Sequence, residues 1–291
     1  MSTAPSVRIG LAQQRCDDVD TEANVKRAEE NVRGAAQRGA KLVCLPELFR
    51  SRYFAQETHA RYFDLAEPVP GPTTARFCAL ARELQVVILV PLFERRAPGI
   101  YHNSVAVIDA DGKVASVYRK MHIPDDPLFF EKYYFTPGDL GFQAVDTAVG
   151  RIGVLICWDQ WFPEAARLTA LEGAQILFYP TAIGWLDGEN DAENAAQREA
   201  WITAQRAHAI ANGVFVASVN RVGREGALRF HGSSFVADPL GRIVEQGPTE
   251  QEALLVVDCD LARIEQERRN WPFLRDRRID AYGGLLRRFG H

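Results

Sequence analysis

Two segments of the chain, about half a chain apart, share one pattern. Residues 36–46 (AQRGAKLVCLP) and 170–180 (ALEGAQILFYP) each read as a helix end, a Gly-Ala turn, a short apolar strand and a proline. A helix that runs into a buried apolar strand is the repeating unit of a parallel α/β sheet. The duplication therefore predicts an α/β protein that forms one domain with two similar halves, in preference to two unrelated domains.

The rest of the chain alternates apolar runs with stretches of helical spacing. Two pairs of short β-like runs are each joined by a turn, which predicts two hairpins. The first pairs 103–108 with 113–118 across the turn at 109–112, and the second pairs 233–237 with 242–245 across the turn at 238–241. The remaining strands are expected at 7–12, 42–45, 86–93, 151–157, 176–179 and 214–220, and the helices at 22–38, 163–171 and 195–211.

Composition excludes several classes of protein. The 291 residues are 47% hydrophobic and carry a net charge of 34 − 38 = −4, with no basic block of the kind that binds nucleic acid. No apolar run approaches the roughly 18 residues of a membrane helix. Met1–Gly10 lacks the charged-then-apolar layout of a signal peptide. We therefore expect neither a nucleic-acid partner nor a membrane span.

The five cysteines form no framework. They are scattered, odd in number and contain no Cys-x-x-Cys, so neither a set of disulfides nor a zinc site is predicted. This usage predicts reduced thiols and a cytoplasmic protein. The cysteines are Cys16, Cys44, Cys78, Cys157 and Cys259.

One of these cysteines stands where a nucleophile is useful. Cys157 is expected at the end of the strand 151–157, directly before the turn that leads into the helix at Pro163. A strand end fixes the side chain, and nearby backbone N–H groups can lower a thiol pKa and hold an oxyanion. Taken alone, a cysteine in an apolar segment is usually a small buried hydrophobic side chain.

Two charged residues also follow predicted strands. Glu47 comes directly after 42–45, where burial can raise a carboxyl pKa into a range suited to proton transfer. Lys120 ends the run 117–120. Each could equally be a solvated surface charge. No histidine is placed to pair with the cysteine, and His102 and His122 are expected to serve hydrogen bonding or structure.

Together, these segments resemble the nitrilase, or carbon–nitrogen hydrolase, superfamily. The motifs LPELF (45–49), YRKMH (118–122) and ICWD (156–159) match the three catalytic segments of that family, in its order. Glu131, within FFEKYYFTPG (129–138), matches a second glutamate that the family carries between the lysine and the cysteine. The resemblance runs from about residue 7 to residue 258.

The resemblance implies a fold and a set of roles. The fold would be a four-layer α-β-β-α sandwich with pseudo-symmetric halves, assembled as a homodimer or a larger homo-oligomer. Glu47 would act as the base for Cys157, while Lys120 and the N–H of Trp158 would stabilise the oxyanion. Glu131 would orient Lys120 or the substrate. The chemistry needs neither a metal nor an organic cofactor.

Within the superfamily, the segments 120–127, 131–138, 180–184 and 220–223 are similar to the N-carbamoylputrescine amidases. This similarity implies hydrolysis of N-carbamoylputrescine to putrescine, carbon dioxide and ammonia, a step of polyamine biosynthesis. The residues directly after Cys157 (WDQW, 158–161) include no arginine to hold a carboxylate, which favours a substrate with an amine tail. Tyr53 and Trp158 are candidates for walls around the aliphatic stem. Candidate ammonium partners are acids of two loops, Asp125, Asp126, Asp187 and Glu189.

Two alternatives stay open at this stage. One is a β-ureidopropionase or ω-amidase that acts on another small amide or ureido compound. The other is a non-catalytic scaffold, which the presence of all the catalytic residue types argues against.

The last thirty residues differ from the rest. From about Leu261 the chain is rich in arginine, with Trp271, Phe273 and Tyr282 interleaved. We expect a catalytic domain over residues 1–260 and a C-terminal arm over 261–291 that packs on its own subunit or on a partner.

Overall fold

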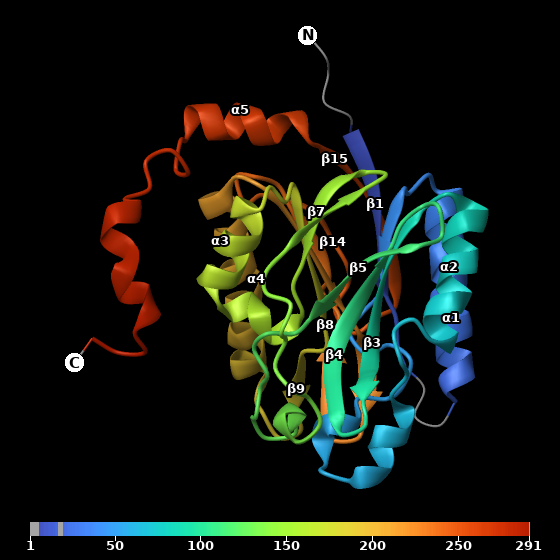
Figure 1. Ribbon diagram of the computed structural model, residues 1–291. Coiled ribbons are helices and arrows are strands. Elements are labelled where there is room, and N and C mark those ends of the chain that lie inside the picture. Colours follow the sequence, from blue (N-terminus) through green and yellow to red (C-terminus); the bar gives the residue numbers. More distant parts are fainter. Residues whose placement is uncertain (1–5, 17–19, 291) are drawn as a thin grey trace.

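The computed structural model describes residues 6–16 and 20–290, so the first five residues of the expected domain lie outside it (Figure 1). Two six-stranded sheets form the centre. The first has the order β15-β1-β2-β3-β4-β5 and the second β14-β13-β10-β8-β7-β6. The strands of the first are β1 (Ser6–Gln13), β2 (Leu42–Cys44), β3 (Val87–Ala97), β4 (Ile100–Ile108), β5 (Val114–Arg119) and β15 (Ala253–Asp260). Those of the second are β6 (Ala144–Thr147), β7 (Gly150–Val154), β8 (Ile176–Thr181), β10 (Phe215–Asn220), β13 (Phe235–Ala237) and β14 (Ile243–Gln246).

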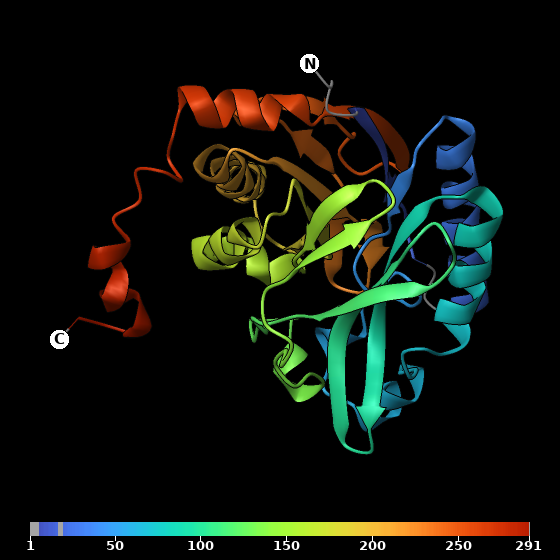
Figure 2. The same ribbon diagram turned by 45° about the horizontal axis from the view of Figure 1, so that its top comes forward.

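Helices cover the outer faces of both sheets, which makes four layers (Figures 1 and 2). Helices α1 (Thr21–Gln37) and α2 (Pro72–Leu84) pack on the first sheet, and α3 (Pro163–Leu171) and α4 (Asp191–Asn212) pack on the second. The α-β-β-α sandwich is thereby confirmed.

Successive side chains of a strand point to opposite faces of its sheet, so each strand contributes to two separate hydrophobic cores. In β2, Leu42 and Cys44 point into the core between the sheets, whereas Val43 points outward beneath α1 and α2. Helix α1 in turn buries Val25 and Ala28, with later residues of the same stripe, at helical spacing.

The two sheets repeat one pattern of strand directions. From β15 to β5 the successive pairs are antiparallel, parallel, parallel, antiparallel and antiparallel. From β6 through β7, β8, β10 and β13 to β14 the order is the same. Thus β2 and β8 occupy equivalent places, as do β1 and β7. This confirms the two similar halves that the repeated sequence predicted.

A pair of glycines shows how closely the halves agree. A Cβ on Gly10 of β1 would lie 2.8 Å from the Cβ of Ala35, and one on Gly153 of β7 would lie 2.3 Å from Cγ2 of Thr169. Each glycine therefore lets the following helix approach its own strand at the same position of the repeat.

Most expected elements are present. Helix α3 has the predicted bounds, and both predicted hairpins form, as β4–β5 and β13–β14. The strand expected through Cys157 is shorter than predicted, because β7 ends at Val154 and Cys157 opens the 3-10 turn η4 (Cys157–Trp161).

Some elements were missed. Helix α2 was not predicted, nor was the small third sheet of β9 (Gly184–Leu186), β11 (Val222–Glu225) and β12 (Leu228–His231). Short 3-10 turns at η1 (Phe54–Gln56), η2 (Ala60–Leu65) and η3 (Glu131–Tyr133) complete the body of the protein.

The C-terminal arm leaves the sandwich after β15. Helix α5 (Ala262–Asn270) is followed by a segment that runs along one side of the body and ends in η5 (Ile279–Leu286) (Figure 1). Large apolar side chains of this arm are open to solvent, with Ile279 75% and Leu286 94% exposed. Within the described residues, no helix is long and apolar enough to cross a membrane.

Candidate active site

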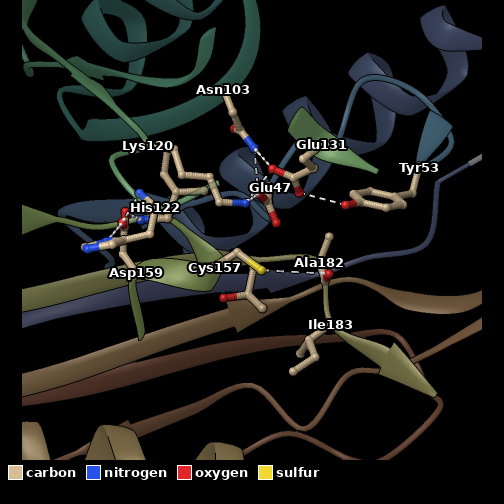
Figure 3. Close-up of polar contacts among 12 residues, drawn as sticks. Glu47, Tyr53, Asn103, Lys120, His122, Glu131, Cys157, Asp159, Ala182 and Ile183 are labelled. Carbon is tan, nitrogen blue, oxygen red and sulfur yellow. Dashed lines mark hydrogen bonds and ion pairs between the residues drawn. The ribbon is translucent and has the colours of Figure 1, made fainter. Parts of the chain in front are cut away.

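Four predicted residues meet between the two sheets. Glu47 follows β2, Lys120 follows β5, Glu131 begins η3 and Cys157 begins η4 (Figure 3). The first three are fully buried and Cys157 is 5% exposed. The first sheet with its loops supplies the charged groups, and the second sheet supplies the thiol.

Lys120 lies between the two carboxylates. Its Nζ donates to Oε1 of Glu47 at 2.8 Å and to Oε2 of Glu131 at 2.7 Å. Burial alone would lower the pKa of Lys120, but the negative charges of Glu131 and Glu47 outweigh it and raise this pKa above its ordinary value. Lys120 is therefore a permanent positive charge in the site.

Glu47 has one occupied oxygen and one open one. Oε1 accepts from Lys120 and from Nδ2 of Asn103, the latter at 2.7 Å, whereas the buried Oε2 has no hydrogen-bond partner among the described residues. Burial raises the pKa of Glu47, Glu131 raises it further, and the positive charge of Lys120 opposes the shift. A carboxylate with an unused oxygen and a raised pKa is suited to accept and return a proton.

Cys157 occupies a sharp turn. Its φ of 42° lies in the left-handed region, which is uncommon for a residue with a side chain. Its Sγ faces the carbonyl oxygen of Ala182 at 3.9 Å. Burial, together with the charge of Glu47, raises the pKa of the thiol well above its ordinary value. This direction is opposite to the lowering expected from backbone N–H groups, and it favours a resting thiol that a nearby base activates.

The charges of the cluster explain why the base must be close. Two carboxylates and one ammonium give a net charge of −1 in a buried site. If Cys157 lost its proton to bulk water, the net charge of the cluster would become −2, which is costly in a low-dielectric interior. Moving the thiol proton to Glu47 leaves the net charge of the cluster unchanged.

Asp159 ties the lysine loop to the cysteine turn. One of its oxygens accepts from the backbone N–H of Ile156 at 2.9 Å and from the hydroxyl of Tyr118 at 2.7 Å. The other accepts from the backbone N–H of His122 at 3.0 Å and lies 2.7 Å from Nδ1 of that histidine. Because these segments flank Lys120 and Cys157, Asp159 fixes their separation. The structural role expected for His122 is confirmed.

Sequence reasoning missed Asn103 and did not foresee the contact that Tyr53 makes. Asn103 lies in β4, in a strand that had been predicted, but no motif marked its amide as a donor to Glu47. Tyr53 is fully buried, and its hydroxyl donates to Oε1 of Glu131 at 2.7 Å. It therefore contacts the charged cluster and lies outside the lining of the cavity that opens at Cys157.

A cavity of about 440 Å³ opens at Cys157. Trp158, expected as a wall, lines it, and so do Asp126 and Glu189. Asp125 is exposed and lies outside the lining, and Asp187 pairs on the surface with Arg224. Among the described residues that line this cavity there is no lysine or arginine. Most of the lining is apolar: Pro124, Pro127, Phe129, Trp161, Phe162, Ala182, Ile183, Leu186 and Ala200.

Glu189 is held in place at the cavity. Its Oε2 accepts from the backbone N–H of Leu186 and its Oε1 accepts from Nε2 of Gln197, each at 3.0 Å. A carboxylate fixed in this way presents a defined negative charge to whatever enters.

Comparison with known proteins agrees with this geometry. The carbon–nitrogen hydrolase family matches residues 8–269. An N-carbamoylputrescine amidase of Solanum lycopersicum is 46% identical over 96% of this chain and 95% of its own, and a citrullinase of Francisella tularensis is 38% identical over 98% and 99%. A carbon–nitrogen hydrolase of Helicobacter pylori G27 superposes with a TM-score of 0.95 and 46% identity, over 98% of this chain and all of the other.

The chain therefore belongs to the carbon–nitrogen hydrolase family, the nitrilase superfamily. It is a cysteine-dependent amidase, and the non-catalytic alternative is set aside.

Proposed function

We propose that the chain hydrolyses N-carbamoylputrescine to putrescine, carbon dioxide and ammonia, a step in polyamine synthesis. The observation that carries this is the cavity at Cys157, which combines apolar walls with two carboxylates, Asp126 and Glu189, and has no cation among the described residues that line it. A four-carbon stem suits the walls, and a terminal ammonium suits the acids. The similarity to a plant N-carbamoylputrescine amidase supports the same assignment.

In the first half of the reaction, Glu47 takes the proton of Cys157 through its open Oε2 as Sγ attacks the ureido carbon. The substrate oxygen becomes an oxyanion next to Lys120 and the N–H of Trp158. A donor placed in this way lowers the barrier by roughly 3 kcal/mol. Glu47 then gives its proton to the departing ammonia, which leaves a thiocarbamate between Cys157 and the putrescine nitrogen.

In the second half, Glu47 removes a proton from water as the water attacks the thiocarbamate carbon. The C–S bond breaks, and Cys157 recovers its proton. The released carbamic acid decomposes to carbon dioxide and putrescine. Glu131 holds Nζ of Lys120 at 2.7 Å throughout and orients it without exchanging a proton.

The ammonium of the tail is assigned to Glu189, with Asp126 as a second acid at the cavity. Glu189 is the better oriented of the two because Leu186 and Gln197 fix its oxygens. Trp158, Phe129 and Ile183 line the same cavity as Glu189 and Cys157, and these apolar side chains suit a stem that needs no polar partner.

The alternative is a carboxylate-tailed substrate of the kind used by a β-ureidopropionase or an ω-amidase. Two acids at the cavity disfavour such a tail, because a carboxylate next to them would be repelled and left unpaired. A carboxylate tail would need a cation from outside the lining described above.

Ammonia release from three compounds decides between these substrates. N-carbamoylputrescine, n-butylurea and N-carbamoyl-β-alanine share the ureido head but end in a cation, a methyl group and an anion. We expect kcat/KM to fall in that order, with about a hundredfold between the first and the last. Equal values, or a preference for the acid, would overturn the substrate while leaving the chemistry of Cys157 intact.

A pair of variants tests whether Glu189 is the carboxylate that binds the ammonium of the substrate. Glu189→Gln should raise KM for N-carbamoylputrescine about tenfold or more and leave KM for n-butylurea nearly unchanged. Glu193→Gln is the matched control, since Glu193 is exposed in the first turn of α4. If both glutamates behave alike, the ammonium is bound elsewhere.

The assembly is proposed to be a homodimer or larger. The arm exposes Ile279, Leu286 and Phe289, and the neighbouring helix α3 exposes Leu168 and Leu171. Apolar side chains gathered in this way mark an interaction surface, and a second copy of the chain is the proposed occupant. Sedimentation of the intact chain at micromolar concentration should give at least twice the mass of one chain. A single-chain mass would contradict the proposal.

A cytoplasmic location is proposed on the state of the cysteines. All five are free thiols, three of the four outside the site are buried, and none forms a disulfide. Free thiols are typical of a reducing compartment. Fractionation of the source cells should find the activity with cytoplasmic markers, and activity in a secreted fraction would contradict this.

A further inference from the structure

Arg221 is a fully buried cation that the chemistry above does not use. It stands between β10 and β11, and its Nη1 donates to both oxygens of Glu225 at 2.9 Å. Its Nη2 donates to the carbonyl oxygens of Glu47, Leu48 and Ser51, at 3.0, 2.8 and 3.2 Å. All three carbonyls belong to the loop that carries the base.

The loop needs such support from outside. Leu48 has a φ of 50°, in the left-handed region, and the bond from the N–H of Ser51 to the carbonyl of Leu48 is a long 3.3 Å. Carbonyls that turn inward around a bend must find donors, because burying them unpaired is costly. The planar fork of an arginine can serve several carbonyls at once.

Glu225 holds the far end of the same loop. Its Oε2 accepts from the backbone N–H of Tyr53 at 2.5 Å. The hydroxyl of Tyr53 in turn donates to Glu131, which holds Lys120. Thus Arg221 fixes the start of the loop and Glu225 fixes its end, and both contacts lead to the charged cluster.

We propose that Arg221, paired with Glu225, is a positioning residue for catalysis that sets the place of Glu47 relative to Cys157. The inference rests on the proposed role of Glu47 as the base. Arg221 follows a strand of the second sheet, the sheet that carries Cys157, whereas its three acceptors follow β2 of the first. The guanidinium therefore sets the spacing between the two sheets where base and thiol must meet.

The charge of Arg221 also acts on Glu47. Burial alone would lower the pKa of Arg221, but the neighbouring groups Cys16, Glu225 and Glu47 raise it. The attraction is mutual, so Arg221 favours the ionised form of Glu47. Removing the cation should raise the pKa of Glu47, which moves the acid limb of the pH profile for kcat to higher pH. Loss of packing alone would not produce that shift.

Two variants test the proposal without leaving a buried charge unpaired. Arg221→Lys keeps the charge but loses the fork. The double variant Arg221→Met with Glu225→Gln removes both charges and keeps an acceptor for the N–H of Tyr53. Glu225→Gln alone is measured as the reference for the double variant, because the two proteins differ only at residue 221. Arg224→Met is the matched control, because Arg224 lies three residues after Arg221, in β11 beside Glu225, but pairs with Asp187 at the surface.

Steady-state ammonia release is measured against pH for each purified variant, with its thermal unfolding midpoint. We expect kcat to fall about tenfold in Arg221→Lys and about a hundredfold in the double variant, with KM changed less than about threefold. The acid limb of the double variant should lie at higher pH than that of Glu225→Gln alone, because these two proteins differ only in the cation at residue 221. Arg224→Met should match the wild type.

The outcome separates two kinds of failure. If the folded double variant keeps kcat within about twofold, or loses activity with the same acid limb as Glu225→Gln alone, Arg221 is structural and the proposal is overturned. Glu47→Gln is run in the same assay. Should that variant retain wild-type activity, the role of the base itself fails and takes the inference with it.

Discussion

The strands β2 and β8 hold equivalent places in the two sheets, yet different chemistry follows them. Each is flanked by two parallel neighbours, and a proline closes each repeat, Pro46 and Pro180. After Pro46 comes the buried carboxylate of Glu47. After Pro180 come two uncharged residues, Thr181 and Ala182. Ala182 lines the cavity, and its carbonyl oxygen accepts from the thiol of Cys157. The same fold thus supplies charge in one half and a pocket in the other.

The strands β1 and β7 repeat the contrast. Their registers against β2 and β8 match Ile9 with Ile152 and Gly10 with Gly153. Counting onward from these glycines, Gln14 occupies the position that Cys157 occupies in the second half. The comparison shows that the duplicated frame does not itself confer activity. Activity arises because the charged groups of one half face the thiol of the other.

The largest effect should come from the nucleophile. Cys157→Ala should abolish ammonia release, by a factor of about a million, because no other group forms the covalent bond. Gln14→Ala is the matched control from the other half and should keep kcat within about threefold. Measurable turnover in a Cys157→Ala variant whose thermal unfolding midpoint equals that of the wild type would show that the thiol of the second half is not the nucleophile.

The charged partners come next. Glu47→Gln and Lys120→Ala should each lower kcat about a thousandfold with a smaller change in KM, because each acts on the transition state. Steady-state kinetics on both variants give the split between the two constants. A variant that changes KM alone would show that its residue only binds substrate.

The pH profile tests the charge balance of the cluster. Because the pKa of Glu47 is raised, kcat/KM should fall as pH decreases through a value above the ordinary 4.5 of a glutamate. Glu131 contributes to that shift, so Glu131→Gln should move the acid limb to lower pH. An acid limb that stays in place, or moves upward, would show that Glu131 does not act on the base through its charge.

Linkage gives the matching stability effect. A carboxyl whose pKa is raised on folding binds its proton more tightly in the native state, so stability falls as pH rises from the unfolded value through the folded one. Glu47→Gln removes this loss and should unfold at an equal or higher temperature than the wild type at neutral pH. Thermal denaturation of both proteins at acidic and neutral pH checks it, and a lower midpoint in the variant would refute it.

The smallest effects compare the two glycines. Gly153→Ala places a Cβ 2.3 Å from Thr169 and 2.8 Å from Leu177, whereas Gly10→Ala meets only Ala35 below 3 Å, at 2.8 Å. Overpacking of this kind costs about 1–3 kcal/mol, and Gly153→Ala should be the more destabilising. Denaturant unfolding of both variants measures the difference, and the reverse order would show that the halves pack differently.

The sequence predicted the parts of this structure that rest on local patterns. The repeat at 36–46 and 170–180 predicted the two similar halves, and the apolar runs predicted the positions of β2, β8 and β10. Three motifs pointed to Glu47, Lys120 and Cys157, which the structure brings together. Helix α2 was missed because its apolar stripe is sparse and mixed with threonines.

What the sequence could not give depends on long-range contacts. Asn103 and Arg221 look like ordinary strand and loop residues until the fold places them 56 and 174 positions from Glu47 in the chain, within hydrogen-bond distance. The sequence predicted a strand through Cys157 because the apolar run continues past Val154. In the structure, the strand pairing of β7 ends at Val154. The sequence favoured Asp125 over Glu189 among the candidate acids, whereas the cavity is lined by Glu189 and not by Asp125.

The central claim is that a carboxylate of the first half activates the thiol of the second. Alkylation of Cys157 by iodoacetamide, followed by peptide mass spectrometry, tests it without any substrate. At neutral pH, labelling of Cys157 should be at least about tenfold slower in Glu47→Gln than in the wild type, because the buried thiol then lacks a base. Equal labelling rates in the two proteins would contradict the account.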